Sequence, residues 1–125
     1  MQAIKNSLSL PVKKMQALHE GKGTVLDQQV FSPADFTDLA EGVSAWDFIV
    51  RLEMPPSSSI GEHRHGANEE IYIIQQGQGL MQLEGKSYKV VAGDIIVNRA
   101  FGEHGLMNNS PQPLVLLVLQ ASLKP

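Results

Sequence analysis

The stretch EIYIIQQGQGLMQLEGKSYKVVAGDIIVN, residues 70–98, decides the fold class of this chain. It alternates short runs rich in Ile, Val, Leu and Tyr with glycine-containing turns, of which GQG, EGK and AGD are the clearest. Runs of this length and composition favour β-strands, and the pair Glu84-Gly85 favours the tip of a hairpin. We therefore expect strands and tight turns throughout this stretch, with no helix.

The same pattern continues on both sides. Residues 45–54 alternate, with Trp46, Phe48 and Val50 on one side, which is the period of a half-buried strand. A serine cap followed by proline in SPADF predicts one helical turn or a tight loop. Further strands are predicted at residues 24–31, 104–108 and 114–121. Roughly eight to ten short strands without a helical period indicate an all-β sandwich or barrel.

The composition narrows the class of protein. The 125 residues fit one domain, with residues 1–23 as an N-terminal arm able to exchange strands and residues 24–125 as the barrel. Thirteen acidic and ten basic residues give a net charge of −3 without a basic block, which argues against nucleic-acid binding. The absence of cysteine leaves imidazole, carboxylate or water as metal ligands. The apolar run 114–119 is too short to span a membrane, and no signal peptide is evident, so we expect a cytoplasmic protein.

Three of the four histidines are candidates for a metal site. In a strand His63 and His65 project from the same face, because side chains alternate with a period of two. Either Glu69 or Glu70 can add a carboxylate, and His104 can arrive from a neighbouring strand. The alternative is a polar loop in which these histidines are solvated separately.

The spacing of these residues resembles the two sequence motifs of the cupin family. The motifs are G-x5-H-x-H-x(3,4)-E-x6-G and G-x5-P-x-G-x2-H-x3-N, and the similarity covers residues 45–121. The matching positions are His63, His65, Glu70 and Gly77 in the first motif, and Gly93, His104 and Asn108 in the second. Glu69 and Glu70 both satisfy the gap after His65, but only Glu70 also satisfies the gap to Gly77. Glu69 is therefore expected to face solvent or the barrel mouth.

The chain departs from the motifs at three positions. Ser57 stands where the first motif opens with glycine, Arg99 replaces the proline of the second motif, and Phe101 replaces its glycine. The turn before His104 is therefore expected to differ in shape, although the histidine keeps its register.

The resemblance implies a double-stranded β-helix, or jelly-roll barrel, with His63, His65, Glu70 and His104 as the ligands of one divalent metal ion. Nitrogen and oxygen ligands suit Fe, Mn, Ni, Zn, Cu or Co, and do not select among them. Such a set leaves a position open for water or substrate. Glu70 and Tyr72, which share the inner face by parity, are candidate catalytic bases.

Two more residues bear on the site. Arg99, if it lies at the barrel mouth, is a candidate for binding a substrate carboxylate or phosphate, and the alternative is a surface arginine. His19 in the arm has no partner at metal-ligand spacing, and we expect it at the surface. A contact with the barrel mouth of a second copy is its alternative role.

The resemblance implies a small metalloenzyme acting on a sugar, keto acid or organic acid, by isomerase, dioxygenase or decarboxylase chemistry. The alternative is a cupin that binds or senses a sugar or other small ligand without turnover. The fold itself does not select among these functions. A homodimer is also expected, because the arm is long and similar cupins pair through exchanged edge strands.

Overall fold

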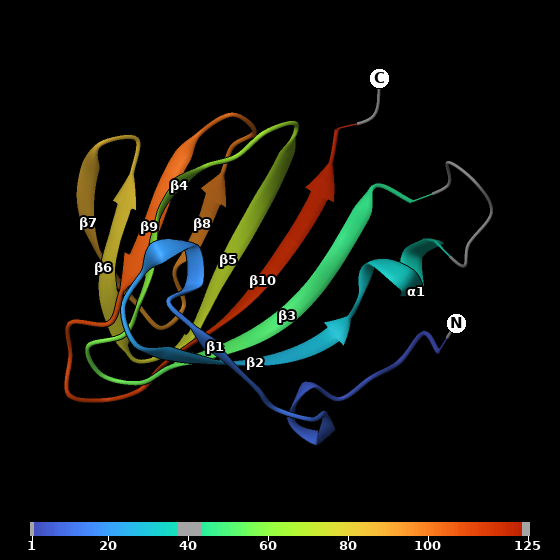
Figure 1. The fold of residues 1–125 in the computed structure, drawn as a ribbon, viewed down its shortest axis with the longest axis horizontal. Coiled ribbons are helices and arrows are strands. Elements are labelled where there is room, and N and C mark those ends of the chain that lie inside the picture. Colours follow the sequence, from blue (N-terminus) through green and yellow to red (C-terminus); the bar gives the residue numbers. More distant parts are fainter. Residues whose placement is uncertain (1, 38–43, 124–125) are drawn as a thin grey trace.

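The computed structural model describes residues 2–37 and 44–123, and their architecture is all-β (Figure 1). The strands of this part of the chain are β1 (Lys13–Gln16), β2 (Thr24–Phe31), β3 (Trp46–Met54), β4 (Ser59–Arg64), β5 (Asn68–Gln76), β6 (Gln78–Leu83), β7 (Lys86–Val91), β8 (Ile95–Asn98), β9 (Glu103–Met107) and β10 (Leu114–Ser122). Two short 3-10 turns, η1 (Ser7–Ser9) and η2 (Leu18–Glu20), and one helical turn, α1 (Pro33–Thr37), complete the elements.

The strands form two antiparallel sheets that enclose the core. The larger sheet has the order β1-β2-β3-β10-β5-β8, and the smaller has the order β4-β9-β6-β7. Figure 1 shows the smaller sheet at the left and the larger sheet sweeping across to the right. Buried apolar side chains from both sheets pack in a single cluster between them. The fold therefore has the two-layered barrel architecture that the strand pattern predicted.

Local sequence explains most of these elements. The hairpin between β6 and β7 turns at Glu84 and Gly85, whose φ angles of 49° and 78° are those of the predicted tight turn. In the predicted helical turn, the backbone N–H of Ser32 donates to Asp35 Oδ2 at 2.7 Å, which caps α1. Along β3 the inward residues Val50, Leu52 and Met54 are buried, as the alternation indicated. Trp46, at the start of the strand, is 41% exposed.

Two strands were not predicted. β1 lies inside the N-terminal arm and pairs with β2 of the same chain, with Lys13 opposite Asp27. Its exposed sequence KKMQ carries no alternating signal, so only the neighbouring strand defines it. β4 begins at Ser59, in a segment that the prolines made look like a loop, and it is held by pairing with β9. Exchange of the arm between two copies stays a prediction.

No helix among the described residues is long and apolar enough to cross a membrane. The cytoplasmic location stays a prediction.

Candidate metal centre

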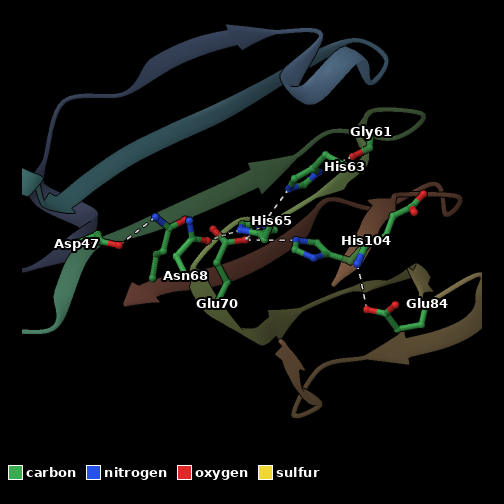
Figure 2. A network of polar contacts seen from close by, with 10 residues as sticks. Asp47, Gly61, His63, His65, Asn68, Glu70, Glu84 and His104 are labelled. Atoms are coloured by element: carbon green, nitrogen blue, oxygen red, sulfur yellow. Dashed lines mark hydrogen bonds and ion pairs between the residues drawn. The ribbon is translucent and has the colours of Figure 1, made fainter. Parts of the chain in front are cut away.

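Four predicted ligands from three strands and one loop meet inside the barrel. His63 on β4 lies directly opposite His104 on β9, and His65 follows the end of β4. Glu70 projects from β5 in the other sheet, so the group joins both layers (Figure 2). One ligand atom from each of the four residues lies within 4.8 Å of the others, an arrangement that could hold a metal ion.

The separations match the size of a shared ion. Glu70 Oε1 lies 3.0 Å from His65 Nε2 and 3.3 Å from His104 Nε2. His63 Nε2 lies 3.1 Å from His65 Nε2. Ligand bonds of about 2.0–2.2 Å place neighbouring donor atoms about 3 Å apart around one metal ion. Three of the contacts in the group therefore already have the spacing of a coordination shell.

Hydrogen bonds at the far side of two imidazoles fix which nitrogens face the group. His63 Nδ1 lies 2.8 Å from the carbonyl oxygen of Gly61, and His65 Nδ1 bonds the Asn68 Oδ1 atom. Because these oxygens accept, each Nδ1 carries the proton and each Nε2 presents a lone pair. Two lone pairs 3.1 Å apart repel each other, and a cation between them relieves that repulsion. These tautomers are those of metal-ligating histidines.

The surroundings of His104 also indicate a metal ligand. Its side chain is 1% exposed, and its Nε2 atom has no hydrogen-bond partner despite the nearby Glu70 oxygen. The 3.3 Å separation is short enough for an ion pair but lacks hydrogen-bond geometry. A buried, unpartnered nitrogen beside a carboxylate costs stability unless another group uses its lone pair. The donor set thus fits a divalent cation.

The electrostatic environment keeps the His63 imidazole neutral. Burial lowers the pKa of His63 to about 4. The hydrogen bond to Gly61 opposes this shift in part, and the neighbouring imidazoles of His19, His104 and His65 add to it. Only neutral imidazole ligates a metal ion, so this environment favours binding at neutral pH.

Tyr72 lies against the group in the protonated form. Its ring meets the His104 ring edge to face, with centroids 5.4 Å apart. Burial, and secondly the charge of Glu70, raise the pKa of the Tyr72 hydroxyl well above its ordinary value. A neutral phenol donates a hydrogen bond or a proton, so the environment favours a donor over the base considered from the sequence. The catalytic role of Tyr72 stays a prediction.

The structure separates the remaining candidates. Glu70 is 7% exposed and inside the barrel, whereas Glu69 is exposed, as the motif spacing predicted. Arg99 is exposed in the turn after β8 and does not line the cavity beside the group. The structure therefore does not bring Arg99 to the cluster, and its contact with a substrate stays a prediction.

His19 is exposed, as expected, but its contact with the metal-ligand group within the same chain was not predicted. Its ring stacks on that of His63, with centroids 3.6 Å apart and an interplanar angle of 7°. The arm of the same chain brings it there: η2 packs on β4, where Gly21 and Gly61 allow backbone contact. His19 is exposed yet contributes to the wall of the cavity. No local pattern marks it, because the contact depends on how a segment without strong propensity docks.

The motif positions without ligand roles have structural ones. Gly77 and Gly93 have φ angles of 85° and 97°, and the two positions where glycine is replaced, Ser57 and Phe101, have φ angles of 70° and 62°. The departures thus keep a left-handed backbone that glycine adopts at lower cost. Asn108 is fully buried and donates from its amide to the carbonyl oxygens of Met54 and Gln112, both at 2.8 Å.

A cavity of about 170 Å³ opens beside the ligand group. Its polar wall consists of His19, Asp27, Gln29, Glu70 and Tyr72. The volume is below the roughly 300–1,000 Å³ of sites for drug-sized molecules, so it suits a small ligand. Glu70 is the member of the metal-ligand group that lines the cavity.

A barrel of two antiparallel sheets with three histidines and one carboxylate grouped inside is the arrangement of a cupin. A family model described as the cupin domain matches residues 50–120, and the chain belongs to this family. An oxalate-binding protein of Thermotoga maritima is 26% identical over 113 residues, which are 90% of this chain and 88% of that protein.

Solved structures agree with this assignment. A crystal structure of a protein from Thermotoga maritima, described as a predicted oxalate decarboxylase, superposes with a TM-score of 0.87 at 25% identity, covering 96% of this chain and 99% of that one. The polyketide cyclase RemF of Streptomyces resistomycificus has a TM-score of 0.75 at 18% identity, covering 100% and 82%. The second likeness concerns the fold alone.

Proposed function

We propose that this protein is a metal-dependent cupin that binds a small organic acid beside the group formed by His63, His65, Glu70 and His104. The observation that carries the proposal is the convergence of these four ligand atoms beside a small cavity that Glu70 lines. Three imidazoles and one carboxylate leave a bound divalent ion with a net positive charge and an open position, which attracts an acid. The relative that binds oxalate makes a carboxylic acid the first ligand class to test.

The group supports a resident ion of the first transition series. When bound, such an ion supplies a Lewis acid that polarises and holds a carboxylate oxygen. The protein's own residues then set the surroundings: Gly61 and Asn68 orient two imidazoles, and apolar side chains form much of the cavity wall.

Metal and acid binding can be tested together. Protein purified without added metal or chelator should contain about one divalent ion per chain by inductively coupled plasma mass spectrometry. Calorimetric titration with oxalate and with pyruvate should then give metal-dependent binding. Glu70→Gln should weaken the metal affinity by at least about tenfold, whereas Glu69→Gln, its exposed neighbour, should leave it unchanged.

Two results would contradict the proposal. Unchanged metal content in the single variants of His63, His65 and His104 to Ala would show that the ion is bound elsewhere. Metal-loaded protein that binds neither acid would show that the cluster does not serve this ligand class.

Decarboxylation of the bound acid is the second candidate function. It is favoured by the 25% identical structure described as a predicted oxalate decarboxylase and by the protonated Tyr72 beside the group. Loss of carbon dioxide from oxalate breaks the carbon–carbon bond and requires a proton at the remaining carbon, which gives formate. Formate release by wild type that is lost in Tyr72→Phe, with oxalate affinity retained, would support this function.

We also propose that two copies associate through the outer face of the larger sheet. Ile95 and Val97 on the edge strand β8 are 65% and 56% exposed. Opposite them on β5 lie Ile73 and Ile71, whose outward side chains are half-buried. A contiguous apolar face of this kind is unusual on a monomer and typical of an interface.

A further inference from the structure

The walls of the cavity beside the metal-ligand group are mainly apolar. The apolar residues that line it are Leu18, Phe48, Val50, Leu52, Ile60 and Val118, contributed by η2 and by both sheets. The cavity volume is about 170 Å³. The cavity therefore suits a ligand body of a few non-hydrogen atoms that is itself largely apolar.

The charges around this cavity disfavour a doubly charged ligand. Two carboxylates, Asp27 and Glu70, line it, and no lysine or arginine is among its lining residues in the described part of the chain. A second anionic group at a distance from the metal-ligand group would meet apolar walls and the negative charge of Asp27. Burying an uncompensated charge there is costly.

Asp27, which is half-buried, and Gln29, which is exposed, line the cavity from β2, the strand three places from β5 in the larger sheet. They alternate with Gln28, which points to the other side and bonds Arg51 and the carbonyl oxygen of Leu10. The Asp27 Oδ1 atom is buried and has no hydrogen-bond partner. Burial raises the pKa of the Asp27 carboxyl, and the charge of Lys13 on β1 opposes this only in part. A hydrogen-bond donor reaching Asp27 would therefore offset a desolvation cost.

We propose that Asp27 and Gln29 recognise the far end of a singly charged ligand, a small 2-oxo or 2-hydroxy acid whose short apolar body ends in a hydroxyl group. The carboxylate end lies at the metal-ligand group, the apolar body lies along the cavity wall, and the terminal donor bonds the Asp27 carboxylate. This inference rests on the proposed function and narrows its ligand class from small acids in general.

The test uses the metal-loaded full chain, with cobalt(II) as the bound ion so that its visible absorption reports ligand binding. Affinities should rise about fourfold per added methylene from pyruvate to 2-oxobutanoate to 2-oxopentanoate, because each methylene is buried against apolar walls. Replacing the terminal methyl of 2-oxopentanoate by hydroxyl, in 4-hydroxy-2-oxobutanoate, should strengthen binding about tenfold. Oxalate should bind more weakly than 2-oxopentanoate.

Variants of Asp27 separate recognition from a structural role. Asp27→Leu should make the protein prefer 2-oxopentanoate over 4-hydroxy-2-oxobutanoate. It should also raise the thermal midpoint of the metal-free protein, because it removes an unpartnered buried oxygen. Asp27→Asn keeps the shape and should reduce the preference for the hydroxyl compound at least about threefold. Asp47→Asn is the matched control: this half-buried carboxylate on β3 already bonds Gln120 and Ser122, so affinities should not change.

The outcomes distinguish the recognition site at Asp27 from metal-dependent acid binding itself. Tightest binding of oxalate, or an unchanged preference in both Asp27 variants, would overturn the recognition site and leave metal-dependent acid binding intact. Failure of the metal-loaded wild type to bind any of these acids would overturn both.

Discussion

Two glycines that join the N-terminal arm to the barrel should be among the least replaceable residues of this protein. A Cβ atom at Gly21 would lie 2.1 Å from the carbonyl oxygen of Ser59, and one at Gly61 would lie 2.1 Å from that of His19. The neighbour in each case is backbone, which cannot rotate away. Gly21→Ala therefore requires the arm to move by about 1 Å from β4.

The cost follows from the contacts that this movement breaks. The backbone N–H of Ser59 donates to the Lys22 carbonyl oxygen, and the backbone N–H of Lys22 donates to Ser59 Oγ, both at 2.8 Å. Each contributes about 1 kcal/mol, and the half-buried Leu18 that packs on the core contributes about another 1 kcal/mol. We therefore expect Gly21→Ala to lower the free energy of unfolding by about 3 kcal/mol, or the thermal midpoint by about 12 °C.

Circular dichroism of the metal-free protein during heating measures this loss directly. Gly66→Ala is the matched control, because a Cβ there meets no atom within 4 Å and φ is not positive. It should stay within about 0.5 kcal/mol of wild type. Gly61→Ala should resemble Gly21→Ala. If either of these variants unfolded at the same temperature as Gly66→Ala, the tight docking of the arm would be refuted.

Three other predictions concern pH, buried amides and assembly. The folded-state pKa of His63, about 4, lies below its ordinary 6.5. The stability of the metal-free protein should therefore be full above pH 6.5 and fall towards pH 4. Urea unfolding should show a loss of about 1.5 kcal/mol, because solvent screens this half-exposed ring. Asn98→Leu should raise the thermal midpoint, because neither side-chain amide atom of Asn98 has a hydrogen-bond partner. Asn108→Leu should instead lower the free energy of unfolding by about 3 kcal/mol, because three hydrogen bonds are lost. Sedimentation equilibrium at micromolar concentration should show a dimer that Val97→Lys converts to monomer; a wild-type monomer would contradict the proposed interface.

Much of the fold follows from short-range patterns. The alternation of residues 45–54 and the glycine turns of residues 70–98 specify strands whose inner faces the structure buries. The choice of Glu70 over Glu69 needed only the motif spacing and the period of two, since a shift of one residue changes the face of the sheet. These features are local, and a single sequence carries them in full.

The arm shows what local patterns omit. The position of His19 depends on left-handed φ angles at Ala17, His19 and Glu20, which are uncommon for residues other than glycine. Such a conformation persists only because surrounding contacts fix it, and the Gly21 contact with β4 is the clearest of them. Nothing in the segment's own composition favours that conformation. The contact between His19 and His63 is therefore a property of the docked chain and not of the segment alone.

Several buried polar atoms of the barrel interior lower stability and are better explained by function. In the part of the chain that the structure describes, the buried side-chain atoms without a partner are Asp27 Oδ1, His104 Nε2 and both amide atoms of Asn98. Asn98 lies directly opposite Glu70 in the β5–β8 pair, so it shares the inner face with the metal-ligand group. A barrel selected for stability alone would place apolar side chains at these positions, because each unpartnered polar group costs about 1–3 kcal/mol. Their location on the inner side of the barrel is best explained by ligands that complete their hydrogen bonds.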